Sequence, residues 1–234
     1  MESDWPSTLP HRIDEVAEIN KDSRALANGI SKDLTYSDML NCIQAIAEAL
    51  QDVGMGPGLR VLVYQTAALD WVCSMLAIMR IGSIYVPLDI CNPIARLAAV
   101  AANCKVNSIL ADHTMIQDVL QLDTPSAAVI NISTLLLKPS ARVPNCAQAE
   151  SPAAILYTSR TTSIPKGIIV THSGLCNKIK GYTKMWSLGA EHTLQQNTFT
   201  FNHSSNQIYI GLVNGGTVYI ILLDKRVTQL KLQR

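Results

Sequence analysis

The sequence has little net charge and no segment in which charge of one sign accumulates. Nineteen lysines and arginines against 18 aspartates and glutamates leave a net charge of +1 over 234 residues. Proteins that bind nucleic acid or acidic membranes usually carry a basic patch or stripe. The balance of charge therefore argues against nucleic acid and membrane surfaces as main partners.

Long apolar runs are also missing. The longest, Trp71 to Met79, ends at Arg80 and is too short to span a bilayer, which takes about 20 residues. The first five residues, Met-Glu-Ser-Asp-Trp, are acidic and lack the apolar stretch of a secretory signal. These two absences predict a soluble, cytoplasmic protein.

The six cysteines form no C-x-x-C pair, and no histidine lies at metal-ligand spacing from them. Scattered cysteines of this kind predict small buried residues in a reducing compartment rather than a zinc site or a disulfide framework. We therefore assign no metal site. The cysteines are Cys42, Cys73, Cys91, Cys104, Cys146 and Cys176.

Apolar residues make up 48% of the chain, which is ample for a packed core, and strand and helix patterns alternate along it. This alternation predicts an α/β fold with largely parallel sheets flanked by helices. Asn28-Gly29 predicts a tight type I′ hairpin turn, and Thr35 with Asp38 predicts a helix-capping box. Residues 138–152 resemble a linker. Helices are expected at about 12–19, 36–50, 69–81, 93–103, 113–120, 172–186 and 204–213, and extended segments at 60–64, 84–89, 108–111, 127–130, 153–158, 168–171, 193–200 and 217–223.

Residues 157–167 read Tyr-Thr-Ser-Arg-Thr-Thr-Ser-Ile-Pro-Lys-Gly and connect two β-rich runs. Hydroxyls and free backbone N–H groups beside a lysine suit a polyphosphate, because the N–H and O–H groups donate hydrogen bonds and the ammonium neutralises charge. An ordinary hairpin with a Ser/Thr turn fits the composition equally well. The Walker spacing G-x-x-x-x-G-K-[ST] is absent.

The order of these residues resembles the phosphate-binding loop of the adenylate-forming (AMP-binding) enzymes, Y-T-S-G-[ST]-T-G-x-P-K-G, and nine of the eleven positions fit. Residues 34–40, 79–89 and 201–204 resemble three further motifs of the adenylation domains of nonribosomal peptide synthetases. Details at 194–196, 199–204 and 212–216 look most like fungal hybrid polyketide–nonribosomal peptide synthetases. The resemblance covers roughly residues 10–222 and implies the N-terminal subdomain of that fold.

The resemblance implies that an amino acid is activated with Mg-ATP, giving an acyl-adenylate and pyrophosphate, before transfer to the phosphopantetheine thiol of a carrier domain. It assigns no catalytic residue and no phosphopantetheine site to this chain. His172, after the loop, is expected to cap or pack rather than to catalyse. The residues expected to hold the phosphates are Thr158, Ser159, Thr161, Thr162, Lys166 and Gly167.

Asn202, His203 and Asn206 fall where the family contacts its amino acid. The family has an aspartate at position 202, which pairs with the α-amino group of the substrate. An amide accepts a hydrogen bond from an ammonium but supplies no counter-charge. An alternative interpretation is that these three side chains only cap the helix that starts near Ser204.

Two departures from the family pattern lie in the phosphate loop. Arg160 and Ser163 replace glycines that let the backbone approach the phosphates, and glycine also tolerates positive φ. We expect the Arg160 side chain to clash more than its charge helps, so nucleotide binding should be impaired.

The chain is much shorter than an adenylation domain, and the later adenine- and ribose-binding motifs and the C-terminal catalytic lysine are not found in it. We interpret residues 1–22 as a lead-in segment, 23–223 as a partial adenylation domain and 224–234 as a divergent basic tail. Three hypotheses remain: a truncated domain that is weak or inactive alone, a ligase completed in trans by a C-terminal half, or a non-catalytic docking or ligand-binding module.

Overall fold

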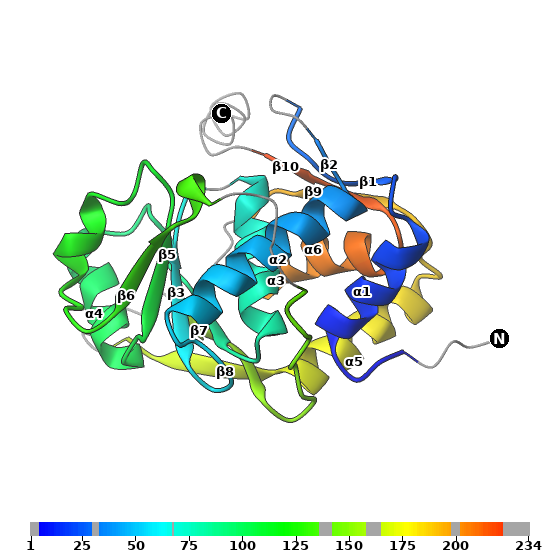
Figure 1. Ribbon diagram of the computed structural model, residues 1–234. Coiled ribbons are helices and arrows are strands. Elements are labelled where there is room, and N and C mark those ends of the chain that lie inside the picture. Colours follow the sequence, from blue (N-terminus) through cyan, green and yellow to red (C-terminus); the bar gives the residue numbers. More distant parts are fainter. Residues whose placement is uncertain are drawn as a thin grey trace, which may run out of the picture.

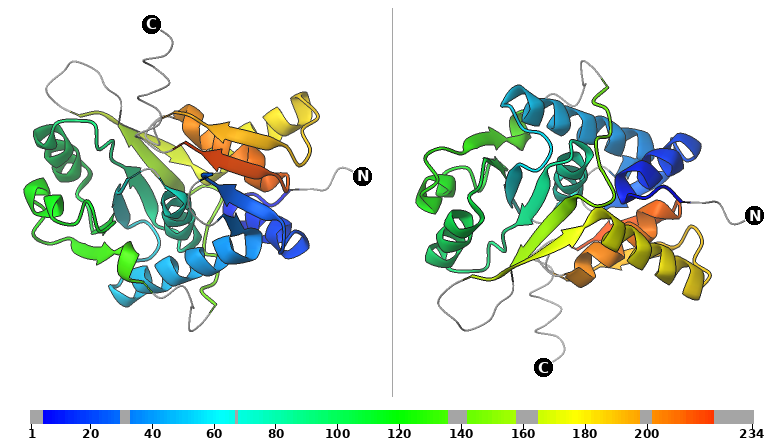
Figure 2. Two further views of the ribbon diagram at one scale, coloured as in Figure 1. Left: turned by 90° about the horizontal axis from the view of Figure 1, so that it is seen from above. Right: turned by 90° about the horizontal axis from the view of Figure 1, so that it is seen from below.

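The structure is a computed structural model and describes residues 5–29, 33–66, 68–135, 142–157, 165–197 and 202–221, with backbone alone at 202 and 203. It holds two sheets with helices packed between and around them (Figures 1 and 2). The predicted α/β fold with largely parallel sheets is confirmed. The helices are α1 (Leu9–Ile19), α2 (Tyr36–Asp52), α3 (Leu69–Arg80), α4 (Ile94–Cys104), α5 (His172–Met185) and α6 (Asn202–Val213), with short 3-10 turns at Asp118–Leu122 and Ile132–Thr134.

The larger sheet has the strand order β6-β5-β3-β4-β7-β8. Its neighbouring strands are parallel except for β7 and β8, which form an antiparallel hairpin. The strands are β3 (Arg60–Tyr64), β4 (Ile84–Pro87), β5 (Ser108–Ala111), β6 (Ala128–Asn131), β7 (Pro152–Tyr157) and β8 (Gly167–Thr171).

The smaller sheet has the order β2-β1-β10-β9, and only β1 and β2 pair antiparallel. Helices α2 and α6 pack against it, and α1 packs against α6. The strands are β1 (Arg24–Ala27), β2 (Leu34–Thr35), β9 (His192–Gln195) and β10 (Thr217–Ile220).

Strand β3 shows why its sequence is almost continuously apolar. Its side chains alternate between two faces, and both faces are buried. Val61 and Val63 belong to the large core that includes α2 and α3, whereas Leu62 and Tyr64 belong to a second core beneath α4. The larger sheet is therefore covered on both sides at its centre.

The capping box at the start of α2 is confirmed. The Asp38 backbone N–H donates to Thr35 Oγ1 at 3.0 Å, and the Thr35 N–H donates to Asp38 Oδ2 at 3.3 Å. Gly54, with φ of +79°, follows the end of this helix.

The tight turn predicted at Asn28-Gly29 is wrong. Strands β1 and β2 do pair, but the register aligns Leu26 with Leu34, so the connection is far longer than two residues. The aligned positions are fixed by packing of β1 against β10 and α2, which the local turn signal does not contain.

The helix predicted at 113–120 is also wrong, because this segment forms turns followed by the 3-10 helix. The Asp112 carboxylate accepts the first free N–H groups, those of Thr114 and Met115, at 2.9 and 3.0 Å. Side-chain bonds of this kind offer the backbone an alternative to helix. Cys91 is likewise exposed rather than buried as predicted.

The segment at 142–151 has no regular structure, yet it is tied to the body through a buried cation. Arg80 is 3% exposed, and its Nη1 lies 2.7 Å from Asp14 Oδ1 of α1. Its Nε donates to the Val143 carbonyl at 2.9 Å, and the Val143 N–H donates to Gln44 Oε1 at 2.7 Å. Residues interpreted as a linker are thus anchored to three helices.

Arg80→Ala should lower the free energy of unfolding by about 3–5 kcal/mol, because it leaves Asp14 without its counter-charge and the Val143 carbonyl without its donor. Urea unfolding followed by circular dichroism measures this. The control is Lys21→Ala, which breaks an exposed pair with Glu18 and should cost at most about 1 kcal/mol. Equal losses in the two variants would contradict the structural role of Arg80.

Candidate functional site

The predicted phosphate loop connects β7 to β8. Their register pairs Tyr157 with Gly167, so residues 158–166 form the connection. Because β7 runs parallel to β4, this connection leaves the sheet at the carboxyl edge, where α/β proteins bind ligands. Within it the structure describes residues 165 and 166. Thr158, Ser159, Thr161 and Thr162, with Arg160 and Ser163, lie outside the described residues, and their roles stay predictions.

Lys166 is exposed and directly precedes β8, at the base of the loop. Gly167 has no room for a side chain, since a Cβ there would lie 2.7 Å from Ile155 Cγ2 and 3.1 Å from Tyr157 Cζ. Tyr157 is held in turn by its hydroxyl, which donates to Asn103 Oδ1 at 2.8 Å. The glycine therefore allows the two strands to close directly below the loop.

Gly167→Ala should destabilise the fold by about 1–3 kcal/mol, because the new methyl group must push the branched Ile155 side chain or the Tyr157 ring aside. Thermal unfolding measures the loss. Gly189→Ala is the matched control, since a Cβ at Gly189 meets no atom within 4 Å. A stability loss no greater at Gly167 than at Gly189 would show that the hairpin adapts freely.

Helix α6 carries the residues that are predicted to contact the amino-acid substrate. It begins at Asn202, two residues before the predicted start. Asn202 and His203 lie in its first turn, and their side chains are outside the described residues. Asn206 lies too far into the helix to cap it. Its side chain is 8% exposed, and its Oδ1 has no hydrogen-bond partner among the described residues.

Strand β9 and helix α3 hold α6 in place. Gln195 Nε2 of β9 donates to Ser204 Oγ at 2.8 Å, and the Tyr209 hydroxyl lies 3.0 Å from Met79 Sδ. Helix α5 directly follows β8 and packs against α6. The two predicted parts of the site thus lie on separate elements that α5 connects.

His172, the first residue of α5, packs as expected. It is 1% exposed, and its Nε2 has no partner among the described residues. Burial, together with a smaller effect of nearby His11, lowers the pKa of His172 to about 4. The imidazole is therefore neutral at pH 7 and serves the core.

Because the folded pKa of His172 lies below the unfolded value near 6.5, the unfolded chain binds more protons between these values. The free energy of unfolding should therefore fall as pH drops from about 6.5 to about 4, by roughly 3 kcal/mol. His172→Gln should flatten this slope in urea titrations at several pH values. His192→Gln, at an exposed position, should leave it unchanged, and an unchanged slope in His172→Gln would refute the assignment.

A polar network at the carboxyl edge was missed from the sequence. Asp112 directly follows β5, and its Oδ2 accepts the Thr66 N–H at 2.6 Å and the Thr66 hydroxyl at 2.7 Å. Burial alone would raise the pKa of Asp112, but hydrogen bonds from Thr114, Thr66 and Met115 outweigh it and hold the pKa below its usual value. A carboxylate placed directly after a buried strand was the signal in the sequence.

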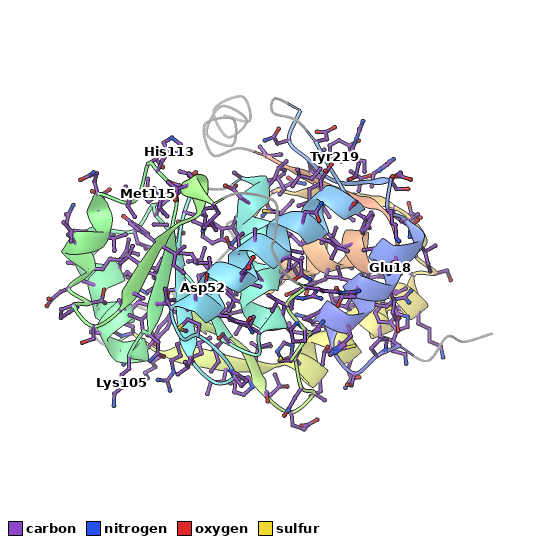
Figure 3. All side chains as sticks on the ribbon, in the orientation of Figure 1. Glu18, Asp52, Lys105, His113, Met115 and Tyr219 are labelled. Atoms are coloured by element: carbon purple, nitrogen blue, oxygen red, sulfur yellow. The ribbon has the colours of Figure 1, made fainter. Side chains whose placement is uncertain are left out.

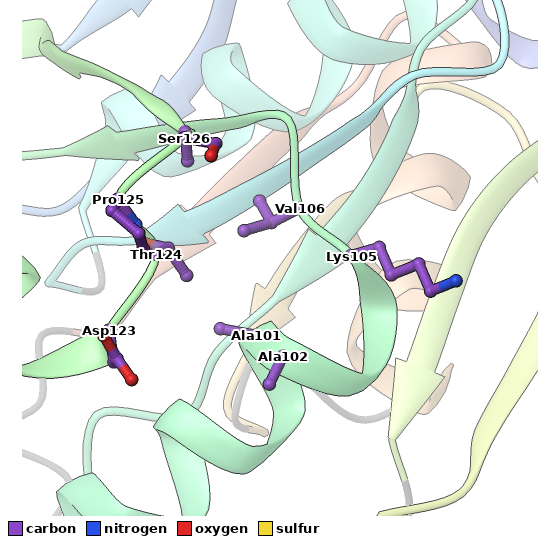
Figure 4. A pocket seen from close by; sticks show the side chains of 9 residues that line it. Ala101, Ala102, Lys105, Val106, Asp123, Thr124, Pro125 and Ser126 are labelled. Carbon is purple, nitrogen blue, oxygen red and sulfur yellow. The ribbon is translucent and has the colours of Figure 1, made fainter.

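The opposite edge of this sheet carries a small hollow of about 160 Å³ (Figure 4). It lies where α4 leads into β5, between Ala101, Val106 and Pro125, and the Lys105 side chain points away from it. Figure 3 shows Lys105 and His113 at opposite ends of β5. The hollow is at the amino edge, where ligand sites are not expected.

Comparisons with known proteins agree with the motifs. A model of the AMP-binding enzyme family matches residues 13–232. This chain belongs to the AMP-binding enzyme family. It is 59% identical over 232 residues to the hybrid PKS-NRPS synthetase thnA of Trichoderma harzianum, covering 99% of this chain and 6% of that protein. It is 55% identical over 226 residues to traA of Penicillium crustosum, again covering 6% of that protein. The chain thus spans a small part of the curated relatives it matches.

Solved structures show the same fold at low identity. The nonribosomal peptide synthetase FmoA3, in a form bound to α-methyl-L-serine-AMP, superposes with a TM-score of 0.80 at 23% identity over 91% of this chain and 24% of that chain. The N-terminal subdomain of Klebsiella oxytoca NpsA superposes with a TM-score of 0.80 at 22% identity over 97% of this chain and 59% of that chain. This AMP-binding chain therefore has the fold of an adenylation N-terminal subdomain.

The AMP-binding family motifs fall on structural boundaries. Residues 34–40 form β2 and the capped start of α2, and 79–89 end α3 and form β4. Among the described residues no group of three or more potential ligands is placed to hold a metal ion. In the same part of the chain, none of the helices combines the length and apolar character needed to cross a bilayer.

Proposed function

We propose that this chain is part of an amino-acid-activating adenylation domain, that residues 158–167 bind the phosphates of Mg-ATP, and that the chain does not complete adenylation by itself. The observation that carries the proposal is the nine-of-eleven match at 157–167, on a hairpin that opens at the carboxyl edge of a parallel sheet. In the reaction, the amino-acid carboxylate attacks the α-phosphorus and pyrophosphate leaves.

The loop residues would act by position and charge. Hydroxyls of Thr158, Ser159, Thr161 and Thr162 donate hydrogen bonds to phosphate oxygens, and Lys166 neutralises charge that grows on the leaving pyrophosphate. FmoA3 has been solved bound to AMPPNP, which supports ATP as the nucleotide of the shared fold.

Helix α6 would contact the amino acid. The Oδ1 of buried Asn206 has no hydrogen-bond partner among the described residues and could accept a hydrogen bond from a substrate. Asn202 replaces the aspartate expected opposite the α-ammonium group, so the chain supplies a hydrogen bond there without a counter-charge. Amino-acid binding should therefore be weaker than with aspartate at this position.

Two substitutions in the proposed phosphate loop support weak or absent activity of the chain alone. Arg160 and Ser163 stand where glycines let the backbone approach phosphate. The partner that would receive the acyl group is a carrier domain.

Completion in trans is a second candidate function, and the smaller sheet favours it. Helices α2 and α6 pack against this sheet, while His192 and Leu194 are exposed on β9, Leu194 to 45%. Mainly parallel sheets are usually covered on both faces. A separate chain supplying the remainder of the domain would cover this face, and mixing the two chains would restore acyl-adenylate formation.

Mg-ATP binding to the purified chain tests the proposed loop, measured by isothermal calorimetry. Lys166→Ala should weaken binding about tenfold or more, because it removes a charged hydrogen-bond donor to phosphate. Lys105→Gln, at the opposite edge of the sheet, removes the same charge and should leave the affinity unchanged. Restoring both glycines with Arg160→Gly and Ser163→Gly should raise the affinity.

Three results would contradict the proposal. An affinity equal in Lys166→Ala and the natural chain would place ATP elsewhere. An unchanged affinity after both glycines are restored would show that Arg160 and Ser163 do not impair the loop. Rapid acyl-adenylate formation by the chain alone would refute the claim that it does not complete the reaction.

A further inference from the structure

A second cavity lies far from the amino edge and outside the proposed nucleotide loop. Its volume is about 290 Å³, and it is lined by α2, the start of α3 and the segments that follow β1 and β6. Its walls are mainly apolar, with Leu34, Ile46, Leu69, Ile132 and Leu135 as the large contributors. Pockets of this size with few polar groups are typical small-molecule sites.

The location is one at which α/β proteins bind ligands. Ala68 follows β3, Ile132 follows β6 and Asn28 follows β1, so strands of both sheets point their carboxyl ends at the cavity. The order in which strands are added to the larger sheet reverses between β3 and β5, because β4 and β5 lie on opposite sides of β3. Ligand sites concentrate at such switch points.

Asp70 supplies the only charged side chain among the described residues that line this cavity. Asp70 lies in the first turn of α3, where the backbone N–H groups of Asp70 and Trp71 favour its ionised form and act to lower its pKa. Burial raises the pKa of Asp70, and the negative charge of Asp112 raises it further, while His113 opposes the rise. Among the described residues no lysine or arginine pairs with Asp70.

A cation beside Asp70 would offset both the partial burial of its charge and the repulsion from Asp112. Asp70 is partly buried, which disfavours an unpaired carboxylate, and the neighbouring Asp112 adds repulsion. An ammonium group would supply a charge-assisted hydrogen bond to Asp70. An anionic ligand would add to the repulsion, and a purely apolar one would leave the carboxylate unpaired.

We propose that this cavity binds a small apolar molecule carrying a protonated amine, with the ammonium on the Asp70 carboxylate and the apolar part against Ile46, Leu69 and Ile132. Asn28 and Ser133 line the same cavity and offer further polar contacts to the amine. The site is separate from the amino-acid position proposed at Asn206 on α6.

Calorimetric titration with 2-phenylethylamine at pH 7 tests the proposal, with 2-phenylethanol as the uncharged counterpart. We expect saturable binding of the amine and binding of the alcohol weaker by about tenfold or more, the usual effect of losing a charged hydrogen bond. Asp70→Asn, which keeps the shape of the side chain, should reduce the preference for the amine to near unity.

A second variant, which fills the cavity, tests the proposal independently of Asp70→Asn. Ala68 makes no side-chain capping bond, so Ala68→Leu fills the cavity without removing a hydrogen bond and should abolish binding of both compounds. Circular dichroism checks that both variants are folded. Asn206→Ala should leave amine binding unchanged, which separates this site from the proposed amino-acid site.

Each contrary result overturns the proposal. These results are no binding of the amine by the folded chain, equal binding of the amine and the alcohol, and full binding by folded Asp70→Asn or Ala68→Leu. Loss of amine binding in Asn206→Ala, with Asp70→Asn unaffected, would place the amine in the amino-acid site instead.

Discussion

The ion pair between Arg80 and Asp14 ties two helices and the segment that leads into β7 to one point. It joins the end of α3 to α1, and through the Val143 carbonyl it fixes the irregular segment that leads into β7. The position of β7 beside β4 determines where the hairpin with β8 opens. A guanidinium suits this role because several donors in a fixed plane satisfy a carboxylate and a carbonyl together. The phosphate loop proposed here thus depends on a residue at the far end of a helix.

Local sequence patterns correctly predicted several helices and strands. The capping box of Thr35 and Asp38 marked the start of α2, and alternating burial along β3 explains its apolar run. The failures have two different causes. Strand pairing with β10 set the register of β1, and this depends on residues that meet only after folding. The Asp112 side chain redirected the backbone after β5 through hydrogen bonds to residues two and three positions on, a local effect that helix periodicity does not contain.

The candidate site divides in the same way. The order of residues at 157–167 identified the loop, but not the close packing of Ile155 and Tyr157 that requires glycine at 167. The position of Asn206 was inferred from motif spacing, whereas its unpaired oxygen is a property of the packed helix. Motif spacing therefore predicts which residues meet a ligand, while burial and hydrogen bonding in the folded chain determine which of their atoms lack a partner among the described residues.

The two proposed binding regions favour opposite charge, although the chain is almost neutral overall. In these proposals Lys166, after β7, faces an anion, and Asp70, in the cavity beside the start of α3, faces a cation. Strand β4 lies between β3 and β7, so the carboxyl ends of these two strands are two strand spacings apart, about 10 Å. At physiological salt the Debye length is about 8 Å, so solvent-exposed charges separated by more than this distance are largely screened from each other. Near-neutral composition is therefore compatible with two oppositely charged sites on one edge of a sheet, because screening and burial make each field local.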